Sequence, residues 1–187
     1  MGDTLIMFDD GKDDILIWVD ENDNITGYGP KMETHEIDQL HRAFSAFIYD
    51  EQMKELLLQC RADGKYHSGG KWSNTCCSHP RQGEELEDAV PLRIRKELGF
   101  DVPEGTPVEH KGSFIYRADL GGIFEHEFDH VFVIRTDKDK IPLDRFDRNE
   151  ISDLKWVATD IIDEELKTDP DKYSAWFARA YRLSRAE

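Results

Sequence analysis

The feature that most constrains the fold of this chain is a pair of strand-like segments joined through Gly121-Gly122. Residues 110–116 and 123–135 have the apolar content of two longer strands, and the glycines between them predict a turn. Shorter strands are predicted at residues 15–19, 41–49, 56–61 and 154–158, the middle two forming a hairpin. Because strands outnumber helices and hairpins dominate, the pattern predicts an α+β fold, a mixed β-sheet flanked by helices.

Helical patterns occupy three further segments. Residues 83–99 begin with acidic side chains, carry Lys96 in the last turn and end at Gly99, a residue suited to the left-handed conformation that terminates helices. Pro91 lies inside this segment and cannot donate a hydrogen bond to residue 87, so we expect a kink or a restart there. The other two helices are predicted at residues 160–167 and 171–185.

Composition argues against several classes of protein. The net charge of −16 disfavours general binding to nucleic acid or to anionic membranes, and no apolar run approaches the length of a membrane span. An anionic substrate would therefore need a local cluster of Lys, Arg or metal ion. Three cysteines make no disulfide framework, and no signal peptide is visible, so we expect a cytoplasmic protein. Its 187 residues are expected to form one domain, as a monomer or a weak homodimer.

The segment from Ser73 to Pro80 carries a thiol two residues before an imidazole, at Cys77 and His79. Thiols and imidazoles have useful pKa values near neutrality, and both bind metals. Position alone leaves three roles open for Cys77: a reactive thiol, a buried structural cysteine, or a metal thiolate together with Cys76. The last role lacks a second cysteine pair to complete a Cys-rich zinc site.

Two carboxylates lie two residues apart in the predicted strand 123–135. Residues at this spacing share one face of a strand, so Glu125 and Glu127 point to the same side, with Asp129 beside them. His126 and His130 then face the other way. Two close carboxylates repel each other unless a cation or a shared proton relieves them, although a solvated acidic face would explain the same pattern.

Histidines supply a second possible part of a site. His35, His41 and His79, together with the carboxylate pair, would make a nitrogen and oxygen site suited to Zn²⁺, Mn²⁺ or Fe²⁺. The sequence does not show that they meet. The other histidines are rivals for the same role: His67, His110, His126 and His130.

Residues 83–100 resemble the signature helix of the Nudix superfamily, in which a run of glutamates holds Mg²⁺ against a diphosphate. The pattern is eroded in this chain. Between Arg93 and Gly99 only Glu97 remains, where Nudix hydrolases have several glutamates. Loss of those carboxylates removes the means of activating water, but Glu97 could still hold one Mg²⁺.

Four motifs taken together resemble the type I isopentenyl-diphosphate isomerases, which have a Nudix-like fold. They are His41–Ser45, Asn74–Pro80, Glu97–Gly99 and Glu125–Glu127, within a match that runs from about Lys31 to Trp176. The resemblance implies an enzyme of isoprenoid biosynthesis that interconverts isopentenyl diphosphate and dimethylallyl diphosphate. It also implies that Cys77 and Glu127 form the catalytic pair and that Tyr116 assists Glu127.

The same resemblance implies metal and substrate sites. One divalent ion, Mn²⁺, Zn²⁺ or Mg²⁺, would be held by three histidines and two glutamates: His35, His41, His79, Glu125 and Glu127. A Mg²⁺ ion would lie at the substrate diphosphate, held by Glu97. The diphosphate itself would be bound by Lys31, Arg61 and Lys65, with Trp176 beside the isoprenoid tail.

Two other functions remain open at this stage. A Nudix-type diphosphate hydrolase is disfavoured by the missing glutamates. A non-catalytic binding module stabilised by a metal would leave Cys77 and the apolar C-terminal helix without a role. The chain also departs from the isomerase pattern at two places, because residues 66–71 lack the Pro-Gly often found there and Pro91 interrupts the helix that carries Glu97.

Overall fold

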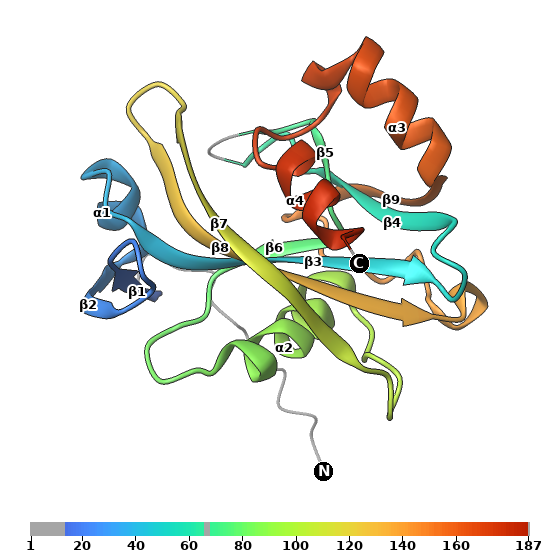
Figure 1. Cartoon of the computed structure of the whole chain (residues 1–187), viewed down its shortest axis with the longest axis horizontal. Helices are drawn as coiled ribbons and strands as arrows, with labels where there is room; N and C mark the ends of the chain where they lie inside the picture. Colours follow the sequence, from blue (N-terminus) through green and yellow to red (C-terminus); the bar gives the residue numbers. More distant parts are fainter. Residues whose placement is uncertain (1–13, 66–67, 187) are drawn as a thin grey trace.

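The sheet at the centre of the molecule is built around one long strand, β3 (His41–Asp50), in a computed structural model that describes residues 14–65 and 68–186. Strand β8 (Phe124–Thr136) runs parallel to β3 over the whole length of β3, from His41 beside Glu127 to Asp50 beside Thr136. The remaining pairings are antiparallel, so the sheet is mixed, as predicted. Figure 1 shows β3 and β8 crossing the middle of the fold.

Within the described residues the sheet has nine strands. Strand β7 (Val108–Asp119) pairs with β8 through the turn at Gly121-Gly122, which confirms the predicted hairpin. The other strands are β1 (Ile15–Val19), β2 (Ile25–Pro30), β4 (Glu55–Arg61), β5 (Trp72–Ser73), β6 (Cys76–Ser78) and β9 (Ile151–Ala158). Strand β6 pairs with β3, while β5 and β9 pair with β4.

Helices cover both faces of the sheet. Helix α2 (Leu86–Leu98) lies on one face, and α3 (Thr159–Thr168) and α4 (Phe177–Ser184) lie on the other (Figure 1). Helix α1 (Lys31–Glu36) stands beside β1 and β2. Two short 3₁₀ turns complete the secondary structure, at Lys138–Lys140 and Pro170–Lys172. No helix in the described part of the chain has the length and apolar character needed to span a membrane.

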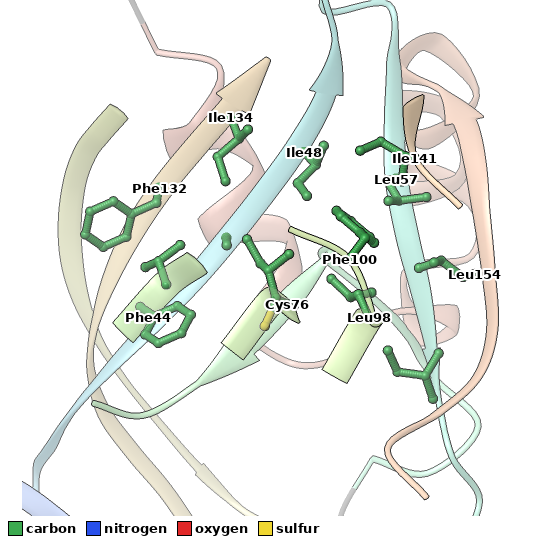
Figure 2. Close-up of a cluster of buried hydrophobic side chains, with 14 of the residues drawn as sticks. Phe44, Ile48, Leu57, Cys76, Leu98, Phe100, Phe132, Ile134, Ile141 and Leu154 are labelled. Atoms are coloured by element: carbon green, nitrogen blue, oxygen red, sulfur yellow. The ribbon is translucent and has the colours of Figure 1, made fainter. Parts of the chain in front are cut away.

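Alternation along β3 divides the core into two layers. Phe44, Ala46 and Ile48 point toward α2, whereas Phe47 and Tyr49 point toward α4. Figure 2 shows the first layer, in which side chains from the sheet and from α2 surround the buried Cys76. Because side chains of a strand alternate between faces, a strand buried on both sides is mostly apolar, and β3 is apolar from Ala43 to Tyr49 except at Ser45.

Three sequence predictions differ from the structure. Helix α2 does not restart at Pro91, because its face of Val90, Ile94 and Leu98 is fully buried and outweighs one missing backbone hydrogen bond. The predicted helix 171–185 forms only from Phe177 onward. The expected hairpin of β3 and β4 pairs only at Tyr49 and Leu56, since β3 takes β6 and β8 as its main neighbours.

Other local features agree with prediction or had no predicted counterpart. Gly99 ends α2 with φ of 76°, and a Cβ atom there would lie 2.2 Å from the carbonyl oxygen of Arg145, so the position requires glycine. Strands β2, β5 and β6 and helix α1 have no counterpart in the sequence prediction.

Candidate active site

One pocket brings together most of the candidate residues from distant parts of the chain. Ten of them line it: Lys31, Arg61, Lys65, Cys77, His79, Glu97, Tyr116, Glu125, Glu127 and Trp176. His35 and His41 are fully buried and adjoin Glu125 and Glu127 in the wall of this pocket. Residues separated by more than 100 positions in the sequence therefore share one site.

The register of the sheet explains how these side chains meet. The parallel pairing of β3 with β8 places His41 beside Glu127, and the pairing of β7 with β8 places Tyr116 beside Glu127. On the other side of β3, strand β6 places Cys77 beside Ser45. Cys77 and Glu127 therefore come from the two strands that flank β3, and both line the same pocket.

Three imidazoles and a carboxylate converge in the wall of the pocket. The ligand atoms of His35, His41, His79 and Glu127 all lie within 4.8 Å of one another. Oε1 of Glu127 is 2.9 Å from Nε2 of His79 and 3.7 Å from Nε2 of His41. Oε1 of Glu125 is 3.5 Å from Nε2 of His35, so Glu125 adjoins the same group.

The donor set fits a divalent cation. Nδ1 of His35 lies 2.6 Å from the carbonyl oxygen of Lys31, and Nδ1 of His41 lies 2.8 Å from that of Gln39. A carbonyl oxygen can only accept, so each Nδ1 carries a proton and each ring turns its Nε2 toward the carboxylates. Lone pairs that face carboxylate oxygens at this distance need a positive charge between them, either protons or a metal ion.

Burial and charge set the pKa values of these groups. Burial raises the pKa of Glu127, but interactions with His41 and Glu125 and the hydrogen bond donated by Tyr116 outweigh it and hold the value at about 2. Burial, together with the neighbouring imidazoles, brings the pKa of His79 well below its ordinary value. The carboxylate of Glu127 is therefore ionised and the ring of His79 is neutral, the states in which both bind metals.

Tyr116 contacts both carboxylates of the strand. Its hydroxyl donates to Oε2 of Glu127 at 2.6 Å and lies 3.3 Å from Oε2 of Glu125. Burial, and then the charge of Glu127, raises the pKa of Tyr116 well above its ordinary value, so the hydroxyl keeps its proton and remains a donor. The two oxygens of Glu127 thus face different groups, the imidazoles through Oε1 and the phenol through Oε2.

The two adjacent cysteines have different surroundings. Cys77 lines the pocket, and its thiol donates to Oδ1 of Asn74 at 2.9 Å. Burial raises the pKa of Cys77 to about 12, against the opposing charge of Arg61, so the group is a thiol rather than a thiolate. Cys76 is fully buried in the core layer on α2, with its sulfur 3.5 Å from Oε2 of Glu97.

Cations lie at the end of the pocket near Glu97. Lys31, Arg61 and Lys65 all line it, and Arg61 is 7% exposed with an Nε that has no hydrogen-bond partner among the described residues. Burial raises the pKa of Glu97 to about 7, helped by the neighbouring charge of Glu150. A buried carboxylate among cations is suited to a phosphate-bound Mg²⁺ ion, which usually takes one or two carboxylates and substrate oxygens.

Trp176 connects this cationic end to the thiol. The guanidinium carbon of Arg61 lies 5.3 Å from the centroid of the indole ring, and the ring of Tyr116 lies 6.1 Å from it. The indole is 4% exposed. Its face therefore supplies an apolar, electron-rich wall between the phosphate-suited residues and the acid–base groups.

Three of the four rival histidines lie outside this pocket. His126 contacts Asp38, and His130 lies 3.0 Å from Asp23 and 3.1 Å from His110, on the opposite face of β8 as predicted. The fourth rival, His67, lies outside the described residues.

Two further charged residues that line the pocket were not predicted from the sequence, Glu150 and Arg81. Glu150 pairs with Lys65, and Arg81 pairs with Asp14. In a chain with 40 acidic and 24 basic residues, no local pattern distinguishes these two from the surface charges.

The chain is similar to known proteins over most of its length. The family model described as NUDIX domain matches residues 39–177 of this chain. The isopentenyl-diphosphate Delta-isomerase 2 of Aromatoleum aromaticum is 44% identical over 167 residues, which are 89% of this chain and 84% of the relative. The protein of the same name from Photorhabdus laumondii is also 44% identical, over 89% of this chain and 90% of its own length.

Solved structures show the same fold at low sequence identity. The protein DR0079 of Deinococcus radiodurans superposes with a TM-score of 0.71 at 18% identity, covering 91% of this chain and 99% of its own. The MutT protein of Methanosarcina mazei superposes with a TM-score of 0.56 at 18% identity, covering 79% of this chain and 96% of its own.

Proposed function

The chain belongs to the Nudix family and, within it, to the isopentenyl-diphosphate Delta-isomerases, and from this premise we propose that it interconverts isopentenyl diphosphate and dimethylallyl diphosphate. The observation that carries the proposal is the content of the pocket. A protonated thiol, an ionised carboxylate and an aromatic wall lie beside a cluster of cations. These are the groups that a proton shift in a diphosphate-bearing alkene requires.

The reaction moves a double bond by adding a proton to one carbon and removing a proton from another. We assign these transfers to Cys77 and Glu127, which come from strands on the two sides of β3. A thiol that holds its proton is ready to give it, and an ionised carboxylate is ready to accept one. The proton count balances, because the substrate gains one proton and loses one.

The intermediate between the two transfers has the character of a tertiary carbocation. Water would trap it, so the site must exclude solvent, and the near-complete burial of Trp176 supports this. The face of the indole stabilises positive charge without reacting with it. Tyr116 orients Glu127 by donating to its Oε2 at 2.6 Å.

A divalent ion at His35, His41, His79, Glu125 and Glu127 would supply charge that fixes the direction of the Glu127 carboxylate. We propose Mn²⁺, Zn²⁺ or Mg²⁺ for this site, and Mg²⁺ at Glu97. Lys31, Arg61 and Lys65 would bind the diphosphate, whose binding energy is remote from the reacting carbons. We also propose a cytoplasmic location, in keeping with three free cysteines, and a monomer or weak homodimer.

The deciding experiment is incubation with isopentenyl diphosphate and Mg²⁺, followed by chromatographic analysis of the products. Formation of dimethylallyl diphosphate without phosphate release supports the isomerase. Release of inorganic phosphate would identify a Nudix-type hydrolase instead, and unchanged substrate would identify a non-catalytic module. A Cys77→Ala variant provides the matched control for contaminating host isomerase.

A further inference from the structure

A buried carboxamide links two parts of the site that are far apart in the sequence. Asn74 is fully buried, between β5 and β6. Its Oδ1 accepts hydrogen bonds from the thiol of Cys77 at 2.9 Å and from the indole Nε1 of Trp176 at 3.1 Å. The hydroxyl of Ser73 approaches the same oxygen at 3.0 Å. One oxygen atom therefore holds the proposed proton donor and the proposed aromatic wall.

The orientation of this carboxamide is dictated by its other end. Nδ2 of Asn74 donates to the carbonyl oxygens of Cys76 at 2.9 Å and of Ala46 at 3.3 Å. Carbonyl oxygens only accept, so the amide nitrogen must face them, and the amide oxygen must face the thiol and the indole. The five contacts are mutually consistent in this orientation alone.

We propose that Asn74 is the positioning residue of this site, and that its single carboxamide oxygen holds the Cys77 thiol and the Trp176 indole in one fixed arrangement. The expected effect on kcat rests on the proposed function, whereas the hydrogen bonds to Asn74 do not depend on it. Cys77 and Trp176 are 99 residues apart in the sequence, so the chain itself does not hold the thiol and the indole together. A shared acceptor removes the freedom of both at once.

The shared oxygen also makes the two contacts compete. A carbonyl oxygen has two lone pairs, yet three donors approach Oδ1 of Asn74. Removing the indole N–H should therefore strengthen the hydrogen bond from the thiol. Two independent side chains with separate acceptors would show no such coupling.

The first test is the infrared S–H stretching band, which lies in a region free of other protein absorption. Subtracting the spectrum of Cys77→Ala from that of the wild type isolates the band of Cys77 without any change at Asn74. We expect this band at the lower wavenumber of a hydrogen-bonded thiol. Asn74→Ala should move it toward the free-thiol position, leaving only the longer 3.4 Å contact between the sulfur and the hydroxyl of Ser73, and Trp176→Phe should move it further down. A wild-type band at the free-thiol position, or a band unmoved in both variants, would overturn the proposal.

The second test separates positioning from general loosening of the fold. Asn74→Ala should lower kcat for isopentenyl diphosphate by roughly 10²-fold, the cost of misplacing a reacting group by about 1 Å, while KM changes less than about threefold because the cations remain. Thr75→Val is the control, since Thr75 is equally buried and bonds Ile48 and Leu57 but not Cys77. It should lose stability yet keep the S–H band and kcat.

The two tests fail in different ways. A protein without isomerase activity would overturn the proposed function, and the infrared bands of the free protein would still decide the role of Asn74. Equal losses of kcat in Asn74→Ala and Thr75→Val, with an unmoved S–H band, would reduce Asn74 to a structural residue.

Discussion

The hydroxyl of Tyr116 donates a hydrogen bond of 2.6 Å to Oε2 of Glu127, while the imidazole of His79 lies 2.9 Å from the other oxygen of the same carboxylate. The two oxygens of this carboxylate therefore have different partners. Oε1 faces the residues suited to a metal, and Oε2 is turned by the phenol toward the pocket. Under the proposed function, this arrangement would let one glutamate act both as a metal ligand and as an acid–base group.

Replacing Tyr116 with Phe should lower kcat with little change in KM. The loss of a hydrogen bond to a charged group costs about 1.5–3 kcal/mol, which corresponds to a decrease of roughly 10- to 100-fold. The ring packing against Trp176 would remain, so the shape of the pocket is kept. Steady-state kinetics with isopentenyl diphosphate check this, and an unchanged kcat would show that Tyr116 does not orient Glu127.

The two adjacent cysteines should respond in opposite ways to substitution. Cys77→Ala should abolish turnover, because Cys77 lines the pocket, whereas Cys76→Ala should keep most of it. Cys76→Ala should instead lower the free energy of unfolding by about 1 kcal/mol, the scale of a small cavity in the core. Turnover and urea unfolding of both variants test this, and comparable losses of turnover would contradict the assignment of Cys77.

Glu97 gives a pH dependence whose sign follows from its environment. Burial raises its pKa from 4.5 to about 7, so the fold favours the neutral form. In metal-free protein the contribution to stability is fully present below pH 4.5, falls as pH rises toward 7, and is lost above pH 7. Glu97→Gln avoids this loss, which amounts to at most about 3 kcal/mol.

Thermal unfolding without metal measures this effect. Glu97→Gln should be more stable than the wild type at pH 8, and the difference should shrink by pH 5. Added Mg²⁺ should stabilise the wild type at pH 8 but not the variant. A gain for Glu97→Gln that is the same at both pH values would show that the carboxylate is not held neutral by burial.

Pro91 offers a test of the packing of α2. The helix continues through this residue although proline cannot donate to the carbonyl of Glu87. Pro91→Ala would restore the donor and should raise the free energy of unfolding by up to about 3 kcal/mol, with turnover unchanged. Urea unfolding measures this, and a loss of stability would show that the ring of Pro91 makes packing contacts worth more than the missing bond.

Sequence patterns predicted the fold where local periodicity and packing agree. The hairpin of β7 and β8 and the face shared by Glu125, Glu127 and Asp129 follow from the two-residue period of strands, and all three side chains are buried on one side. An interruption was predicted at Pro91 because proline removes one backbone hydrogen bond of the helix. Burial of one face of α2 stabilises the helix by more than that bond. The start of α4 at Phe177 is set by a hydrogen bond from Ser174 to Trp72, a contact that no local pattern contains.

The candidate site could be predicted only in part. The resemblance supplied the residues that carry motifs, and the structure brings ten of them to one pocket. Asn74 lies within a motif, but its role depends on a contact with Trp176, 102 residues away. Glu150 lies in a charged segment with no motif, and only the fold sets it beside Lys65. Long-range pairing of this kind leaves no trace in a single sequence.

The central claim is that Glu127 transfers a proton as well as binding metal, and turnover against metal concentration tests it most directly. Glu127→Gln keeps the size and one coordinating oxygen but cannot carry a proton, so turnover should fall by roughly 10²-fold or more and stay low at saturating metal. Glu125→Gln is the matched control from the same face of β8, and excess metal should recover part of its activity. Rescue of Glu127→Gln by added metal would contradict the account, because Glu127 would then be a ligand only.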